Sequence, residues 1–281
     1  MPEEISNKKD KGKAAEKEMS FWEHLEELRW HLLRSAVVLV VLAIGAFLMR
    51  RFIFDVIILA PKEPGFISYR ALCTIGKWLH TDSLCLDIEP LQIVNIQMSG
   101  QFMVHLYISL MTAVVVALPY LLWEIWSFVR PALLPKEKKY SKGIVFYSTL
   151  LFVLGVLFSY FLIVPLTVNF FATYSVSDSV NNTITLNSYI STIVSLTLST
   201  GLVFELPIVV FFLTKVGILT PAFMRKNRKY VIVILLVLAA VITPPDVFSQ
   251  IMVTIPMLLL YEMSIVISAR VLKKRKEELA G

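Results

Sequence analysis

Long runs of apolar residues, separated by charged connections, dominate this chain. A helix needs about 20 predominantly apolar residues to cross the hydrocarbon core of a bilayer. Hydrophobic residues make up 57% of the 281 positions, compared with roughly 45–50% in soluble domains. We therefore expect an all-α polytopic membrane protein. Its six predicted spans cover residues 32–49, 101–126, 144–171, 189–213, 230–242 and 248–269.

The fifth predicted span, residues 230–242, is shorter than the thickness of the hydrocarbon core. We expect the bilayer to thin locally there, or the segment to be partly re-entrant. Pro244 and Pro245 follow it and predict a tight turn, because they cannot continue a helix. Asp246 comes just before the sixth span and can cap its first amides. Gln250 is expected in the outer half of that span.

The distribution of Lys and Arg predicts the topology. Both residues are abundant near the two termini and in the loops at 127–143 and 214–229, and absent from residues 172–188. The positive-inside rule then puts both termini in the cytoplasm of a multi-pass plasma (inner) membrane protein. The first outer loop, residues 50–100, is basic as well, but long loops cross largely regardless of charge. The net charge of +6 therefore does not indicate nucleic-acid binding.

Three regions follow from this topology. Residues 1–19 are charged and poor in large apolar side chains, so we expect a disordered cytoplasmic tail. Residues 20–270 form the transmembrane domain, and residues 271–281 form a basic cytoplasmic tail. The outer loop contains both cysteines, Cys73 and Cys85. An oxidising compartment favours a disulfide between them over two free thiols. The sequence shows no metal-ligand pattern and implies no cofactor.

Glu205 lies inside the otherwise uncharged run 190–213, two residues before Pro207. A carboxylate in hydrocarbon costs roughly 2.5–3.5 kcal/mol on insertion scales. It must therefore be paired, protonated or exposed to a water-filled cavity, or else it is a buried hydrogen-bonded residue that joins two helices. We expect Pro207 to kink the helix, and we place Glu205 toward the outer half of the fourth span.

Two segments at the predicted inner face combine aromatic and acidic residues. Residues 21–29 predict an amphipathic interfacial helix, which carries three glutamates where such helices usually present Lys and Arg. An acidic patch of this kind would attract a cationic partner, although an interfacial anchor with solvated charges is also consistent with it. In residues 123–137, two tryptophans mark the interface and Glu137 lies among lysines. Exposed ion pairs contribute only about 0–1 kcal/mol, so pairing alone does not explain Glu137.

Four motifs, in this order, resemble one family: His24-Leu25-Glu26-Glu27-Leu28-Arg29, Phe128-Val129-Arg130-Pro131-Ala132-Leu133, Phe204-Glu205-Leu206-Pro207, and Thr243-Pro244-Pro245-Asp246-Val247-Phe248-Ser249-Gln250. Over roughly residues 19–271 the chain resembles TatC, the multispanning receptor subunit of the twin-arginine protein translocase. The resemblance implies six helices in a concave, glove-like arrangement, with short fifth and sixth helices. Compared with the commoner family pattern, residues 65–87 are an extension, and Glu124 stands where Gln is frequent.

The resemblance also implies a function. The protein would bind signal peptides with paired arginines through Glu27 and Glu137, and Arg29, Phe128 and Pro61 match other positions important to the family. Glu205 matches a buried acidic residue, interpreted here as a polar contact for a signal peptide or a partner helix. Asp246 and Gln250 match the last outer turn.

The implied partners are TatA- and TatB-type single-span subunits, self-association and the lipid bilayer. Folded cargo would move on the proton motive force, and the chain would not be an enzyme. The alternative is a proton-coupled small-molecule transporter with Glu205 as its proton site. The absence of a visible internal repeat weakens that alternative. An enzyme would require clustered catalytic groups, whereas the four histidines are scattered over different segments.

Overall fold

In the computed structural model, residues 21–78, 80, 85, 91–129, 141–177, 182–243 and 247–280 are described. The chain is mainly helical, as predicted. Its longer helices are α1 (Phe21–Leu48), α2 (Ile67–Trp78), α3 (Gly100–Val129), α5 (Ser141–Phe158), α6 (Val164–Thr173), α7 (Leu186–Val203), α8 (Leu206–Val216), α10 (Arg228–Ile242) and α11 (Val247–Ala280). Its shorter ones are the π-helices η1 (Phe52–Ile58) and η5 (Ser159–Ile163), the 3-10 helix η2 (Ala60–Lys62), and α9 (Pro221–Lys226).

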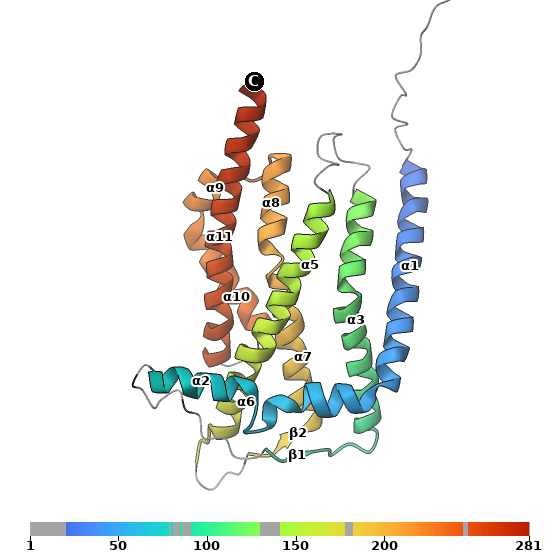
Figure 1. Cartoon of the computed structure of the whole chain (residues 1–281), viewed down its shortest axis with the longest axis vertical. Coiled ribbons are helices and arrows are strands. Elements are labelled where there is room, and N and C mark those ends of the chain that lie inside the picture. The colour runs from blue at the N-terminus through green and yellow to red at the C-terminus, as the bar shows by residue number, and fades with distance from the viewer. Residues whose placement is uncertain are drawn as a thin grey trace, which may run out of the picture.

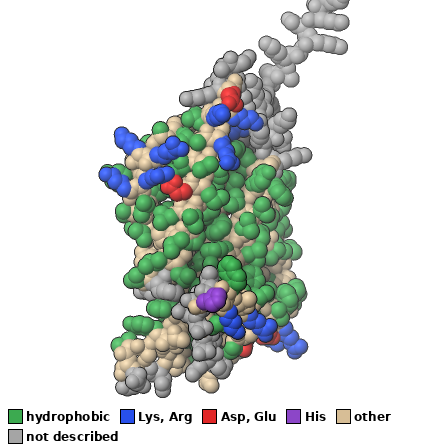
Figure 2. All heavy atoms as spheres, turned by 60° about the vertical axis from the view of Figure 1, so that its left-hand side comes forward, with side chains coloured by type: hydrophobic (Ala, Val, Ile, Leu, Met, Phe, Trp, Pro, Cys, Tyr) green, Lys and Arg blue, Asp and Glu red, His purple; other side chains and the backbone are tan. Residues whose placement is uncertain are grey.

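Five stretches are long and apolar enough to cross a membrane within the described ranges: Leu25–Leu48, Gly100–Phe128, Gly143–Thr173, Leu186–Val216 and Ser249–Lys274. They stand side by side in Figure 1, and the start of α1 and the end of α11 lie at the same end of the bundle. On the face drawn in Figure 2, hydrophobic side chains cover the middle of the molecule, and Lys and Arg gather toward its two ends. The chain is therefore a multi-pass membrane protein.

The last two helices differ from each other in length. Helix α10 covers the fifth predicted span and has only 15 residues. The resemblance implied a short sixth helix, and this expectation is wrong: α11 has 34 residues and continues through the segment predicted as a separate basic tail. Arg228 and Glu262 form an ion pair of 2.7 Å between the two helices. Gln250 Nε2 on α11 also donates to the carbonyl of Leu236 on α10, at 3.0 Å.

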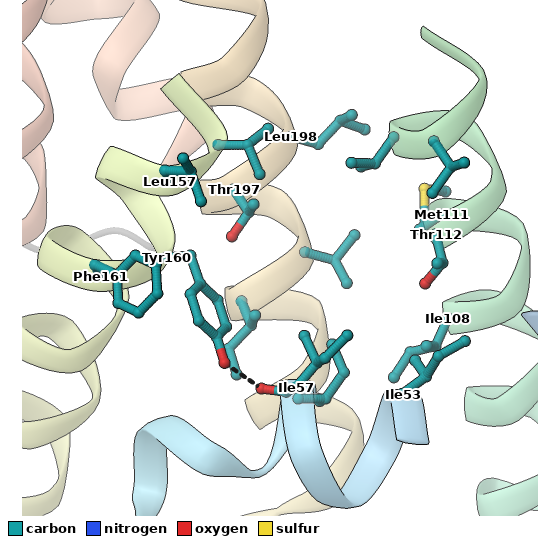
Figure 3. Close-up of a pocket in the computed structure, with 16 residues that line it drawn as sticks. Ile53, Ile57, Ile108, Met111, Thr112, Leu157, Tyr160, Phe161, Thr197 and Leu198 are labelled. Carbon is teal, nitrogen blue, oxygen red and sulfur yellow. Dashed lines mark hydrogen bonds between the residues drawn. The ribbon is translucent and has the colours of Figure 1, made fainter. Parts of the chain in front are cut away.

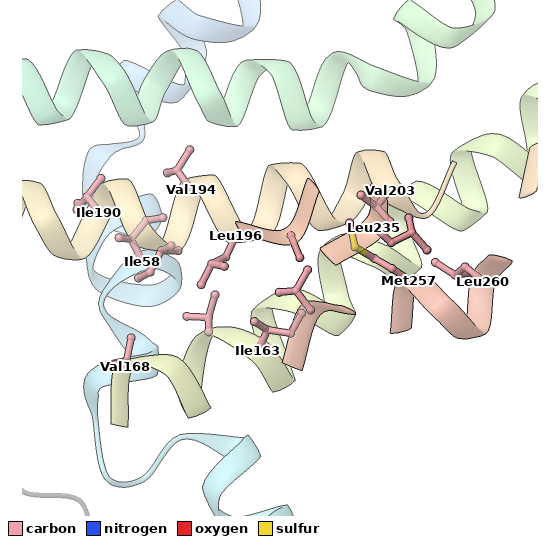
Figure 4. Packing of buried hydrophobic residues seen from close by; sticks show 14 of the residues in the cluster. Ile58, Ile163, Val168, Ile190, Val194, Leu196, Val203, Leu235, Met257 and Leu260 are labelled. Atoms are coloured by element: carbon pink, nitrogen blue, oxygen red, sulfur yellow. The ribbon is translucent and has the colours of Figure 1, made fainter. Parts of the chain in front are cut away.

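The buried core lies where the third, fourth and last spans meet. Buried side chains of α7, such as Leu196 and Val203, belong to one cluster with Ile163 of η5 and with Leu235 and Met257 of the last two helices. Figure 4 shows these side chains converging between the helices. In contrast, only 6% of the most apolar 18-residue stretch of α1 is buried inside the protein. Helix α1 packs chiefly against α3 and presents the rest of its surface outward.

The segment after the first span is fixed by tyrosine hydroxyls. Tyr69 of α2 donates to the carbonyls of Pro61 (2.9 Å) and Pro165 (3.1 Å), and burial raises the pKa of Tyr69 to about 12. Tyr189 of α7 donates to the carbonyl of Ile58 at 3.0 Å. The bonds to Pro61 and Ile58 satisfy carbonyls at the ends of the short helices η1 and η2. Pro61 itself is buried in η2.

Two other links complete this end of the bundle. The two-residue strands β1 (Ile93–Val94) and β2 (Ile184–Thr185) pair in parallel and join the first loop to the start of α7. Cys73 and Cys85 form a disulfide, the pairing favoured above over two free thiols. Residues 1–20 lie outside the described residues, as do Glu137, Pro244, Pro245 and Asp246.

Candidate functional site

Glu27 and Glu124 mark one end of the first two spans. Glu27 is on α1 and its side chain is 34% exposed. Glu124 is on α3 and its side chain is 3% exposed. Between them lies His31 of α1, one helical turn after Glu27. His31 Nε2 is 4.0 Å from Glu27 Oε1, and His31 Nδ1 is hydrogen-bonded to Glu124 Oε2.

The two carboxylates differ in how well they are satisfied. Both oxygens of Glu124 have partners, since the Tyr120 hydroxyl donates to Oε1 and His31 occupies Oε2. Glu27 Oε2, however, is buried and has no hydrogen-bond partner among the described residues. A buried carboxylate oxygen without a donor is unfavourable, and an incoming cation would relieve this. Of these two carboxylates, Glu27 is therefore the one that can still accept a hydrogen bond from a cation. Glu124 does not provide a second such acceptor, because both of its oxygens are already hydrogen-bonded.

The other sequence-predicted residues divide into those near Glu27 and those away from it. The Phe128 ring of α3 lies edge-on to His31, with 6.0 Å between the ring centroids. Arg29 is exposed on α1 and borders a shallow apolar groove with Leu25, Leu28 and Leu32. The sequence reasoning missed His31 and Tyr120. Their spacing could have revealed them, since each lies four residues from a glutamate and so shares its helix face.

Glu205 lies at a break in the fourth span. Helix α7 ends at Val203 and α8 begins at Leu206, with Pro207 buried in the first turn of α8. This is the interruption that Pro207 predicted. Glu205 Oε2 accepts a hydrogen bond from Ser148 of α5. Glu205 Oε1 is buried and has no hydrogen-bond partner in the part of the chain that the structure describes.

The predicted depth of Glu205 is wrong. It lies closer to Val216, the end of α8, than to Leu186, the start of α7, and its partner Ser148 belongs to the first half of α5. The end of α8 and the start of α5 lie on the same side of the bundle as the start of α1 (Figure 1). Glu205 therefore belongs to the half of the bundle that carries Glu27. The error did not come from the span boundaries, because Glu205 is already closer to residue 213 than to residue 189 in the predicted span 189–213.

An apolar groove opens between α3, α5, α7 and η1, with a volume of about 350 Å³. Ile53, Ile108, Met111, Leu157 and Leu198 contribute to its lining, and Figure 3 shows them facing this space. Its polar side chains are Thr112, Thr197 and Tyr160, and the Tyr160 hydroxyl donates to the carbonyl of Ile57 at 2.7 Å. The lining contains no Asp, Glu, His, Lys or Arg. This groove suits an apolar segment rather than a charged solute.

Nothing in the described ranges resembles a metal site, since no three of their His, Cys, Asp and Glu side chains are grouped to hold an ion. The side chains gathered here can accept a cationic group at Glu27 and an apolar segment in the groove. They do not form the nucleophile and base arrangement of a catalytic site.

Comparison with known proteins decides the family. The profile described as Sec-independent protein translocase protein (TatC) matches residues 23–256, most of the chain. This chain belongs to the TatC family. The TatC of Blattabacterium sp. subsp. Periplaneta americana is 41% identical over 92% of this chain and 98% of its own length. The TatCy of Bacillus subtilis is 35% identical over 94% of each chain.

Solved TatC structures agree with this fold. A crystal structure described as the twin-arginine translocase receptor TatC superposes with a TM-score of 0.68 at 30% identity and covers 89% of this chain and 99% of the other. The structure of the receptor in the detergent DDM gives a TM-score of 0.70 at 32% identity, over 88% of this chain and 99% of the other. TatC is a component of a protein translocase, and the resemblance seen in the four sequence motifs is confirmed.

Proposed function

We propose that this chain is the signal-peptide receptor of a twin-arginine translocase. It would bind paired arginines at the end of the bundle that carries Glu27 and, with TatA- and TatB-type subunits, move folded proteins across the plasma membrane on the proton motive force. The observation that carries the proposal is Glu27 itself, a partly exposed carboxylate with one buried oxygen that lacks a donor. Membership of the TatC family supports the same assignment.

The chemistry of arginine fits such a site. A guanidinium group donates two parallel hydrogen bonds to one carboxylate, and these charge-assisted bonds are stronger than neutral ones. We propose that Glu27 holds one arginine and Glu137 the other. Glu137 follows α3 in the sequence, and α3 ends beside the start of α1 (Figure 1). Phe128 and Arg29 would border the bound peptide.

The apolar part of a signal peptide or a partner helix would use the groove between α3, α5 and α7. Leu198 at its border and Glu205 are about two helical turns apart on the fourth span. We propose that the unsatisfied oxygen of Glu205 is the polar contact for this inserted segment.

The proposed topology has six membrane crossings, with α10 as the fifth and both termini in the cytoplasm. We also propose that the receptor associates with further copies of itself. The groove lining contains no ionisable group except Tyr160, which does not favour a proton-coupled small-molecule transporter.

The test is photocrosslinking of a twin-arginine signal peptide to the full-length protein in membranes. We expect Glu27→Ala combined with Glu137→Ala to abolish the crosslink, because both carboxylates that receive arginines are removed. Glu26→Ala is the matched control, since Glu26 is exposed on the same helix and should leave the crosslink unchanged. Membrane extraction and Western blotting establish that every variant inserts. An undiminished crosslink in a well-inserted double variant rules out the proposed site.

A further inference from the structure

Helix α2 lies across the bundle rather than along it. Figure 1 shows it at the end of the bundle opposite the C-terminus, lying across the direction of α11. Its first half is held by Tyr69, whose hydroxyl bonds to the carbonyl of Pro165, and Phe66, the residue before the helix, stacks on Phe161 of η5 with the ring centroids 5.8 Å apart. Its second half carries Cys73, bonded to Cys85. The orientation of α2 relative to the spans is therefore fixed through its first half.

The surface of α2 divides into three sectors at helical spacing. One sector packs against the protein and is buried: Ser68, Tyr69 and Gly76. A second sector is polar and exposed: Arg70, Thr74 and Lys77. The third sector is apolar and exposed: Ile67, Ala71, Ile75 and Trp78. Ile67 is 61% exposed, Ile75 49% and Trp78 79%, so this last sector, called here the apolar sector, is not covered by the described part of the chain.

The apolar sector continues directly onto a membrane span. Ile67, Ala71 and Ile75, with the neighbouring Leu72, form one wall of an open groove, and its other wall is Phe158, Phe161 and Leu162. Those three residues belong to the span Gly143–Thr173, and Phe161 is 40% exposed. A side chain on the outer surface of a membrane span faces hydrocarbon. The groove is therefore open to the region that lipid tails occupy.

We propose that the apolar sector of α2 is inserted into the leaflet at this end of the bundle, with acyl chains filling the groove between α2 and the third span. Helices that lie in the plane of the interface carry large apolar residues on one face and Lys or Arg on the other, and α2 has both. Arg70 and Lys77 lie on the sector next to the apolar one, where they reach lipid phosphates. Trp78, at the end of the helix, suits the headgroup region, in which tryptophan is enriched.

The inference concerns the loop that is longer here than in the commoner TatC pattern, and it does not depend on signal-peptide binding. The bonds of Tyr69 to the carbonyls of Pro61 and Pro165 fit this role, because they set the rotation of α2 about its own axis. A free helix could rotate and exchange its polar and apolar sectors.

The test uses tryptophan fluorescence of the full chain in bilayers of phosphatidylcholine and phosphatidylglycerol. The emission of Trp78 is obtained by subtracting the emission spectrum of the Trp78→Phe variant from that of the unmodified protein. Trp78→Phe is a conservative substitution at an exposed position. Phosphatidylcholine brominated along its acyl chains reports contact with lipid, and aqueous iodide reports contact with water. We expect loss of Trp78 emission with the brominated lipid, greater for bromines near the headgroup than for bromines near the chain end, and little loss with iodide.

Two adjacent positions give a matched pair of controls in the Trp78→Phe background. Ile75→Trp, in the apolar sector, should be quenched by the brominated lipid, and Thr74→Trp, in the polar sector, by iodide. If Trp78 and Ile75→Trp are as accessible to iodide as Thr74→Trp, the helix lies in water and the proposal fails. It also fails if both are shielded from iodide and from the brominated lipid, because a second copy or another protein then covers this face.

Discussion

His31 of α1 and Glu124 of α3 are hydrogen-bonded where the first two spans meet. Tyr120 donates to the second oxygen of the same carboxylate, and the side chains of His31 and Glu124 are only 12% and 3% exposed. Helix α1 packs chiefly against α3, and a second polar link joins His105 of α3 to the carbonyl of Phe47 at 3.1 Å. The hydrogen bond between His31 and Glu124, called here the polar joint, therefore holds α1 against α3 one helical turn from Glu27.

The joint can be tested by replacing its acceptor. Glu124→Leu leaves His31 and Tyr120 without a partner in a buried site, which should lower the free energy of unfolding by about 1–3 kcal/mol. Glu124→Gln keeps an acceptor oxygen and should cost less. Thermal unfolding of the purified protein in detergent measures both changes. A Leu variant as stable as the unmodified protein would show that the joint does not hold α1.

Arginine recognition predicts a preference that charge alone does not. Replacing either arginine of the signal peptide with lysine removes one of the paired hydrogen bonds to a carboxylate. A hydrogen bond to a charged group contributes about 1.5–3 kcal/mol, so the Kd should rise at least about tenfold. Titration of labelled peptides onto the protein in nanodiscs measures this change.

Glu27→Gln provides the comparison. It should weaken binding of the peptide with two arginines. It should also reduce the difference in Kd between this peptide and the one in which lysine replaces the arginine that Glu27 binds. If the variant retains the full preference, Glu27 is not the carboxylate that reads that arginine.

Glu205 should show opposite effects on stability and function. One of its oxygens is buried without a partner in the described chain, so Glu205→Leu removes an unfavourable group, although it leaves the Ser148 hydroxyl without its acceptor. We expect the free energy of unfolding to change by less than about 1 kcal/mol, while export of a twin-arginine reporter is lost. Glu205→Gln, which keeps the bond to Ser148, should retain part of the export. Normal export by the Leu variant would remove Glu205 from the transport path.

The sequence predicted the helical spans well because their signal, the length of apolar runs, is local. The depth assigned to Glu205 was wrong although the predicted span 189–213 already puts it closer to residue 213, the end that leads into the basic loop 214–229. The extent of α11 was missed because apolarity ends near residue 269, whereas the helix continues through charged residues to Ala280.

The candidate site was predictable only in part. Glu27 and Phe128 lie in motifs, and the structure brings both close to His31. The pairing of His31 with Glu124 joins residues 93 positions apart, and no local pattern specifies such a contact. The disulfide was easier to predict, because the chain has two cysteines and they allow a single intramolecular pairing.

That disulfide predicts a labelling result. Without reductant, a maleimide added to the unfolded protein should leave Cys73 and Cys85 unlabelled, and both should react after reduction. Closing a loop of this size contributes roughly 3 kcal/mol in the chain-entropy model, and the effect should be confined to the outer loop. Cys73→Ser with Cys85→Ser should therefore speed proteolysis after Arg70 and Lys77 without a comparable loss in bundle stability. Prompt labelling of both thiols without reductant would contradict the pairing.

The last prediction concerns the crossing of α5 and α7, which two glycines make possible. A Cβ at Gly155 would lie 2.8 Å from Phe204 Cβ and 2.9 Å from Gly201 Cα, too close for the backbone to accept without moving. Gly155→Ala should therefore destabilise the protein by about 1–3 kcal/mol through overpacking. Gly45→Ala on α1 is the control, because a Cβ there meets nothing within 4 Å, and alanine favours the helix by up to about 1 kcal/mol.

Thermal unfolding separates the two glycine variants, and export of a twin-arginine reporter adds a second readout. Phe204 precedes Glu205 at the break between α7 and α8, so a displaced Phe204 should also move Glu205 away from Ser148. Gly155→Ala should consequently reduce export even below its unfolding temperature, whereas Gly45→Ala should not. Equal stability and equal export in both variants would mean that α5 and α7 are less closely packed than their glycines indicate.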